Sequence, residues 1–283
     1  MGPVPLAQFV AHINLASLFR FDRDLYDWDM ETGLKDSNEV NLYDLYTSAF
    51  QKPAKDMRFL ADSFGDRFGK APRSLREDFC GSFANSLEWL RIHRDNTATG
   101  IDVDDDLIRY GRSFLEKASR NIQQRFTLIH GDVSSIELPS ADVVATLNSS
   151  FCEIRDRARL KHYLSECSMT LANPGLLALE LYCGAEAQTV GCDEISVGEF
   201  TTIWEQAEFD PVTNYCLNHI HFRFKDGSKI ERAFSYEWRL WSPAECIDIL
   251  DEVGFKTVTT KVKTDVHGST DTSPTLFILA FKD

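Results

Sequence analysis

The chain has 283 residues, 43% of them hydrophobic and 26% charged, which is the composition of an ordinary globular protein with a substantial core. Its formal net charge of −14 argues against a broad nucleic-acid-binding surface, because such a surface needs basic side chains to replace counterions. No apolar stretch is long enough to cross a bilayer, and no early basic region marks a secretory signal peptide, so we expect a cytoplasmic protein without a membrane partner.

Helices are expected before residue 70. Apolar residues recur at three- and four-residue spacing within 6–20 and again within 40–69, and a polar, glycine-containing loop lies between the two stretches. Pro72 ends this region. We interpret residues 1–70 as an N-terminal helical cover and residues 71–283 as the main domain.

From residue 74 onward, short apolar strands alternate with helices. The expected strands are 74–80, 97–104, 126–133, 141–151 and 176–184. Asn173-Pro174-Gly175 is expected to end the helix before the fifth strand. Such alternation is typical of parallel βαβ units that are covered by helices on both faces, so we predict an α/β fold.

The alternation stops after the fifth strand. Strand-like segments fill residues 200–241, and Asp226-Gly227 between two of them is a strong signal for a hairpin turn. A helix over 243–255 and two closing strands follow. The prediction is therefore a seven-stranded, mostly parallel sheet with helices on both faces and an antiparallel β-hairpin insertion at about 198–241, after strand five.

Polar residues follow the first four expected strands in chain order. Because ligands of an open parallel sheet lie beyond the carboxyl ends of its strands, these residues should meet at one site. Gly81 allows close backbone approach to a ligand, and Asp102 follows it by 21 residues, an interval typical of a carboxylate that binds ribose hydroxyls. Asp132 is placed to accept a hydrogen bond from an adenine amino group, and Glu77 or Asp78 could face an ammonium group.

The segments LREDFCGSFANSLEWL, ATGIDVDDDLI, IHGDVSSI and ADVVATLNSSFCEI resemble, in this order, the motifs of class I methyltransferases that use S-adenosylmethionine (SAM). The resemblance covers residues 40–283 and implies a Rossmann-like domain that binds SAM. It places Gly81 at the middle glycine of the motif, whereas Phe79 and Phe83 stand where the common motif has glycines. It also places Tyr43 and Tyr46 among N-terminal tyrosines that close over SAM.

This resemblance, together with the strand-end residues, defines the expected cofactor site. Arg76 is expected to bind the carboxylate of SAM, and Glu77 and Asn148 stand at the acidic position and the fourth-strand position of the motifs. The expected cofactor contacts are Tyr46, Arg76, Glu77, Asp78, Gly81, Asp102, Val103, Asp132, Val133 and Asn148.

A nicotinamide dinucleotide is the rival ligand. Its G-x-G-x-x-G motif uses glycines to bring the backbone close to a pyrophosphate at a helix N-terminus. The corresponding segment here is Phe79-Cys80-Gly81-Ser82-Phe83-Ala84, with two bulky side chains in the turn. This turn disfavours close contact with a pyrophosphate, which SAM does not contain.

The expected insertion is rich in aromatic and acidic residues. One interpretation is a pocket that attracts an amine or cationic acceptor, and the other is that the aromatic rings pack the hairpin onto the sheet. The candidate acceptor contacts are Phe151, Glu153, Trp204, Tyr236 and Trp238. We expect direct in-line methyl transfer to a small molecule; a SAM-binding module that acts through a protein partner and a protein methyltransferase are the alternatives.

Metal chemistry is not expected from this sequence. The seven cysteines form no Cys-x-x-Cys pair and no cluster with zinc spacing, so we expect reduced thiols. His219 and His221 share one face of an expected strand, but the sequence indicates no third ligand for a metal ion beside them.

Overall fold

The computed structural model describes residues 41–263, 270 and 273–283. The expected helix over residues 6–20 and the loop that follows it lie outside the described residues. Residues Val40–Asp283 form one compact unit. Its helices are α1 (Leu42–Phe50), α2 (Pro53–Phe68), α3 (Ala84–Ile92), α4 (Asp105–Lys117), α5 (Arg120–Arg125), α6 (Arg157–Thr170) and α7 (Pro243–Glu252). No helix among the described residues combines the length and the apolar character needed to cross a membrane.

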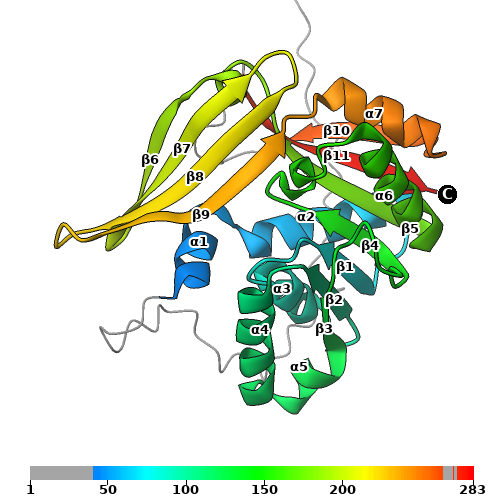
Figure 1. The fold of residues 1–283 in the computed structure, drawn as a ribbon. Coiled ribbons are helices and arrows are strands. Elements are labelled where there is room, and N and C mark those ends of the chain that lie inside the picture. The colour runs from blue at the N-terminus through cyan, green and yellow to red at the C-terminus, as the bar shows by residue number, and fades with distance from the viewer. Residues whose placement is uncertain (1–40, 264–269, 271–272) are drawn as a thin grey trace, which may run out of the picture. The chain divides into compact units, whose positions relative to one another are not determined.

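The main sheet has seven strands in the order β10-β11-β5-β4-β1-β2-β3 (Figure 1). They are β1 (Ser74–Asp78), β2 (Thr97–Asp102), β3 (Phe126–His130), β4 (Ala141–Thr146), β5 (Leu171–Tyr182), β10 (Thr257–Val262) and β11 (Thr275–Lys282). Neighbouring strands from β1 to β5 pair in parallel, and β11 runs antiparallel to both of its neighbours. The predicted seven-stranded, mostly parallel sheet is therefore confirmed.

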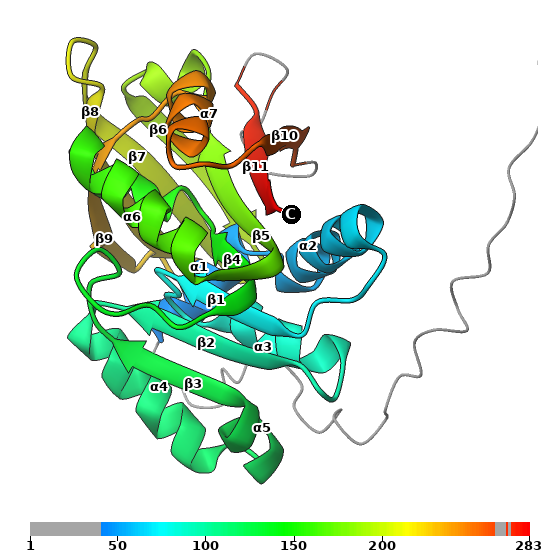
Figure 2. The ribbon, with the colours of Figure 1, turned by 90° about the vertical axis from the view of Figure 1, so that its right-hand side faces the viewer.

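Apolar side chains of the central strands alternate between two buried layers. In β4, Val144 belongs to the cluster that contains residues of α6 and α7, whereas Val143 and Ala145 belong to the cluster of α2, α3 and α4. Figure 2 shows α6 and α7 on one side of the sheet and α2 and α3 on the other. Burial on both faces explains why the adjacent residues Val143, Val144 and Ala145 are all apolar, and it confirms the predicted helical layers.

The insertion after β5 is a second, antiparallel sheet of four strands in the order β6-β7-β8-β9. They are β6 (Gly191–Val197), β7 (Phe200–Asp210), β8 (Tyr215–Phe224) and β9 (Lys229–Arg239). The hairpin at Asp226-Gly227 is confirmed, with Gly227 at φ 87°. The insertion begins about seven residues earlier than predicted, because the exposed edge strand β6 precedes the three predicted strands.

Helix α1 packs against the inner face of this insertion. Asn41 caps the helix by accepting a 2.9 Å hydrogen bond from the Tyr43 backbone N–H. Leu45 from α1 lies in one buried cluster with Phe200, Ile220 and Phe222 of the insertion. The helix therefore lies between the insertion and the strand ends of the main sheet (Figure 1).

Candidate functional site

The turn after β1 follows a left-handed backbone path at three alternate residues. Phe79, Gly81 and Phe83 have φ angles of 56°, 50° and 48°. For a residue other than glycine, the left-handed conformation is roughly 1–2 kcal/mol less stable than the right-handed one. The turn thus keeps the conformation suited to glycine although two of the three positions hold phenylalanine, and such strain is typical of functional sites.

Packing around Phe83 offsets this strain. Its ring is 1% exposed and lies 5.5 to 5.9 Å, centroid to centroid, from the rings of Tyr110, Phe114 and Phe126. Gly111 in α4 leaves the space for it, since a Cβ at that position would lie 3.0 Å from Phe83 Cε1. Above Gly81 the space is open: no atom lies within 4 Å of where its Cβ would stand.

Asp102 is tied directly to this turn. Its Oδ2 accepts a 2.9 Å hydrogen bond from the Gly81 N–H, and its Oδ1 accepts a 3.1 Å bond from the Asp104 N–H. Burial raises the pKa of Asp102, although the backbone N–H groups oppose that shift. Tyr43 lies close by, and burial together with the Asp104 and Asp102 carboxylates raises its pKa to about 12. The structure therefore brings Gly81, Asp102 and Tyr43 together.

Glu77 holds the start of α3. Its carboxylate accepts hydrogen bonds from Asn85 Nδ2 at 2.8 Å, from Ser86 N–H at 2.9 Å and from Ser86 Oγ at 2.6 Å. Burial raises the pKa of Glu77 to about 7 against these hydrogen bonds. The Glu77 side chain is 2% exposed, and its hydrogen bonds fix the first residues of α3 just after the turn.

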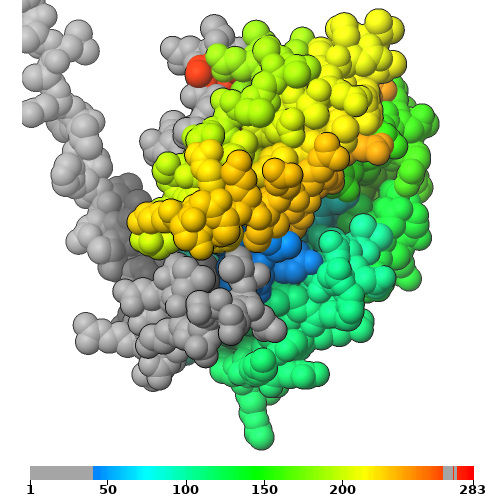
Figure 3. Space-filling model, turned by 60° about the vertical axis from the view of Figure 1, so that its left-hand side comes forward, coloured from blue at the N-terminus to red at the C-terminus, as the bar shows by residue number. Residues whose placement is uncertain are grey.

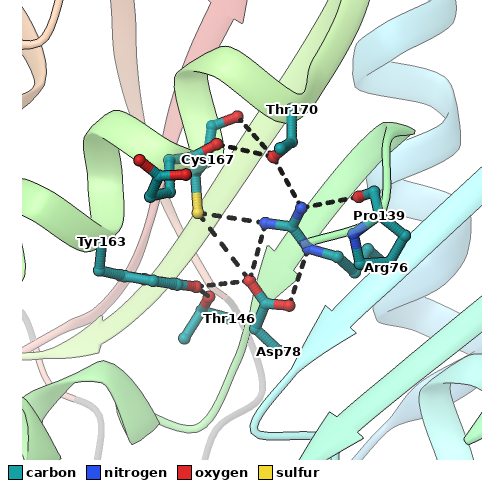
Figure 4. A network of polar contacts seen from close by, with 8 residues as sticks. Arg76, Asp78, Pro139, Thr146, Tyr163, Cys167 and Thr170 are labelled. Atoms are coloured by element: carbon teal, nitrogen blue, oxygen red, sulfur yellow. Dashed lines mark hydrogen bonds and ion pairs between the residues drawn. The ribbon is translucent and has the colours of Figure 1, made fainter. Parts of the chain in front are cut away.

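Arg76 and Asp78 form a buried ion pair (Figure 4). Arg76 Nε lies 2.9 Å from Asp78 Oδ1, and further guanidinium hydrogens bind Pro139 O and Thr170 Oγ1. Tyr163 donates a 2.7 Å hydrogen bond to Asp78 Oδ2. Both charged side chains are fully buried between β1 and α6, where they bind each other, and their assignment as cofactor contacts stays a prediction.

The predicted contacts after β2 and β3 differ in their hydrogen bonds and in their exposure to solvent. Asp132 Oδ1 accepts hydrogen bonds from Ser134 N–H at 2.8 Å and Ser134 Oγ at 2.7 Å, and its Oδ2 faces Arg159 at 3.4 Å. Burial acts to raise the pKa of Asp132, but the Ser134 hydrogen bonds bring it below its usual range. Val133 is buried in the core, whereas Val103 is exposed.

The turn after β4 also has two left-handed residues, Asn148 at φ 54° and Ser149 at φ 58°. Beyond it, Phe151 lies in the core. Glu153 has an exposed side chain, yet the surrounding protein, aided by the Asp102 carboxylate, raises its pKa to about 7. A carboxyl group with such a pKa can exchange a proton near neutral pH.

Helix α1 closes over the strand ends. Thr47 Oγ1 donates a 2.7 Å hydrogen bond to Ser82 Oγ, and Ser82 Oγ donates a 3.1 Å bond to Gln51 Oε1. The hydroxyls of Tyr46 and Tyr236 are hydrogen-bond partners, which joins α1 to β9. In the space-filling view, α1 shows between the strands of the insertion and the α/β part of the molecule (Figure 3).

A cavity of about 1050 Å³ lies beside α1, under the insertion. Asn148, Glu180 and Tyr182 line it from the ends of β4 and β5, and Trp204 and Trp238 line it from the insertion. Of the candidate acceptor contacts, Trp204 and Trp238 thus line this cavity, whereas Tyr236 is not among the lining residues and binds Tyr46.

Sequence reasoning missed a buried charge cluster at this cavity. Lys263 Nζ lies 2.8 Å from Asp56 Oδ2 and 3.0 Å from Glu180 Oε2. Glu180 could have been noticed, because it is a carboxylate inside the apolar strand LLALELY. Asp56 and Lys263 give no such signal, because each has a charged residue close by in the sequence, Lys55 and Lys261, and neither lies inside an apolar run. Among the described residues, no group of three potential ligands could hold a metal ion.

No protein-family model matches this sequence, and no curated protein matches it. Solved structures do. One is an S-adenosylmethionine-dependent methyltransferase from Clostridium acetobutylicum, at TM-score 0.64 and 15% identity, covering 81% of this chain and 92% of that one. Another is SAM-bound CalS10, an amino pentose methyltransferase from Micromonospora echinaspora, at TM-score 0.62 and 14% identity, covering 88% and 99%. The sugar N-methyltransferase KedS8 from Streptoalloteichus matches at TM-score 0.60 and 17% identity, covering 86% and 93%. The chain therefore has the fold of SAM-dependent methyltransferases.

Proposed function

We propose that this chain is an enzyme that transfers a methyl group from SAM to a small-molecule acceptor, with an amine nitrogen as the atom methylated. The observation that carries the proposal is the left-handed turn at Gly81, joined by a hydrogen bond to Asp102 at the end of β2. The structural neighbours described as an amino pentose methyltransferase and a sugar N-methyltransferase support the acceptor class.

The residues around the turn fit SAM. Open space above Gly81 admits the ligand, and the partly exposed Asp102 carboxylate is suited to ribose hydroxyls. By their positions after β3, after β4 and in α1, Asp132 and Val133 are the proposed adenine contacts, and Asn148 and Tyr46 are the proposed contacts nearer the methyl group. Bound SAM supplies a methyl group that is already activated on a sulfonium, so the chain has only to bind, align and shield the reactants.

In this proposal, α1 and the insertion align the acceptor with SAM and exclude water from the site. Orientation of two reactants can supply about 7–11 kcal/mol of a barrier. Trp204 and Trp238, whose ring centroids lie 5.6 Å apart, make an apolar wall of the cavity. Thr47 and Tyr46 fasten α1 to the turn and to the insertion, so that one helix holds both sides of the site.

An ammonium acceptor must lose a proton before its lone pair can attack a methyl group. Glu153 is the proposed group to take that proton: it lies within electrostatic range of Tyr46 and Asp102, and the surrounding protein raises its pKa to about 7. The Glu180 and Asp102 carboxylates add negative charge that attracts an ammonium group to this region.

Calorimetry tests the proposal. SAM and S-adenosylhomocysteine are expected to bind with a 1:1 stoichiometry, and NADH is expected to bind weakly. Tighter binding of NADH than of SAM would contradict the assignment. A protein that binds SAM, yet forms no S-adenosylhomocysteine with any fraction of a metabolite extract, would instead be a non-catalytic SAM-binding module.

A further inference from the structure

The inner face of the insertion carries buried donors without a hydrogen-bond partner. Gln206 and Trp238 are each 7% exposed, and neither Gln206 Nε2 nor Trp238 Nε1 has a partner among the described residues. Both side chains line the cavity beside α1. Because buried polar groups are nearly always paired, we expect an atom from outside the chain, a water or a ligand atom, to pair with these two donors.

The chemistry of the two donor groups determines which kind of atom can pair with them. The indole N–H of Trp238 can only donate a hydrogen bond, so its partner must be an acceptor. Asn218 stands directly across from Gln206 in the β7–β8 pairing, and its Oδ1 is also unpartnered. Rotation of these two amides could pair them with each other, but it would leave the Trp238 donor unpaired.

The charge of the cavity limits the ligand further. Three carboxylates, Glu180, Glu186 and Asp193, line it against two lysines, and Lys263 is already shared between Asp56 and Glu180. An acceptor atom that carries a full negative charge, as in a carboxylate or phosphate, is repelled there. The complementary partner is the neutral oxygen of a hydroxyl, ether or carbonyl group.

We propose that Gln206 and Trp238 form a specificity subsite for a neutral oxygen of the acceptor amine. The subsite selects among acceptors and takes no part in methyl transfer itself. This inference rests on the proposed methyltransferase function, because it assigns the cavity to the acceptor. The Trp204 and Trp238 rings supply the apolar wall along which the rest of the acceptor lies.

Three amines on one ring test the subsite with labelled SAM: trans-4-aminocyclohexanol, cyclohexylamine and trans-4-aminocyclohexanecarboxylate. We expect kcat/KM to be about tenfold higher for the alcohol than for cyclohexylamine, the size of effect produced by one added hydrogen bond. The carboxylate is expected to be the poorest acceptor. In Gln206→Met and Trp238→Phe, the preference for the alcohol should shrink severalfold while the affinity for SAM stays unchanged. A preference that both variants retain would overturn the proposal.

Thermal unfolding of the ligand-free protein provides a test that needs no acceptor. Gln206→Met removes an unpaired donor at similar volume, so Tm should stay the same or rise. The matched control is Asn96→Leu, because buried Asn96 donates to Trp89 O at 2.9 Å and accepts from Arg73. The control should lower Tm. A fall of similar size in Gln206→Met would mean that its amide is paired within the fold, and it would contradict the subsite.

The failure of this inference differs from the failure of the proposed function. If the wild-type protein does not bind SAM, the methyltransferase assignment is wrong. If it binds SAM, and tryptophan fluorescence detects no binding of any of the three amines to the SAM complex, the cavity is not an acceptor site with this subsite.

Discussion

Phe79 and Phe83 hold a turn whose path glycine normally provides. In the sequence they mark a departure from the common motif, and they leave the path of the turn open. The structure shows instead that the backbone path is kept and that the room comes from a distant residue, Gly111. Gly111 lies in the middle of an expected helix, and nothing nearby in the sequence indicates that it faces Phe83.

Asp102→Ala should weaken SAM binding by about 1.5–3 kcal/mol, the value of a hydrogen bond to a charged group. The same change also removes the acceptor for the Gly81 N–H, so Asp102→Asn, which retains one oxygen there, should lose less. Calorimetry measures both, with exposed Asp106→Ala as the control. Unchanged affinity in a folded Asp102→Ala protein would show that this carboxylate does not contact the ribose.

Glu153 should give the reaction a pH dependence near neutrality. Its pKa is raised from 4.5 to about 7, so the carboxylate that accepts a proton forms only as the pH rises through 7. We expect kcat/KM to increase up to that pH and then level off. In Glu153→Gln this step should vanish and the rate should fall about 10²–10⁴-fold. Glu237→Gln, on the exposed side of the insertion, should keep the wild-type profile. A step that persists in Glu153→Gln would contradict the assignment of this titration to Glu153.

At the scale of elements, Arg76 and Asp78 join β1 to α6. From the sequence they look like ligand contacts, because they stand near the end of the first strand. Their partner Tyr163 comes 85 residues after Asp78, and only the packing of α6 against the sheet reveals it. Strand β6 was missed for a related reason: its residues are largely exposed, so it lacks the apolar pattern that predicts a strand.

Breaking this ion pair should destabilise the fold. Arg76→Met leaves the Asp78 carboxylate buried without its cation and should lower the free energy of unfolding by about 3–5 kcal/mol. The double change Arg76→Met and Asp78→Leu removes both charges and should cost clearly less. Urea unfolding of the ligand-free proteins gives both values. Equal losses in the single and double variants would show that the pair contributes through shape rather than charge.

At the scale of the whole molecule, the sequence predicted the layers, the strand-end turn and the position of the insertion. It could not predict the cavity, because the lining residues come from α1, β4, β5 and the insertion, and their meeting depends on packing between distant segments. Trp238 belongs to the buried core and also lines the cavity, so its packing role is visible while its role as an acceptor contact stays a prediction.

Trp238→Ala and Trp204→Ala should therefore differ. Trp238 is almost fully buried, so its truncation should cost about 3–5 kcal/mol of stability as well as turnover. Trp204 is only partly buried, and its truncation should reduce turnover with a smaller change in Tm. Thermal unfolding measured beside turnover separates the two effects. A loss of stability in Trp204→Ala as large as in Trp238→Ala would assign both rings to structural packing.

The position of β11 bears on how the protein is made. This strand is synthesised after all the others, yet it lies inside the sheet, between β5 and β10. Until residues 275–282 leave the ribosome, β5 presents an apolar edge with unpaired backbone groups, which is the kind of surface that joins to other chains. We therefore expect the partly synthesised chain to be more prone to join other chains before β11 pairs with β5 than after it.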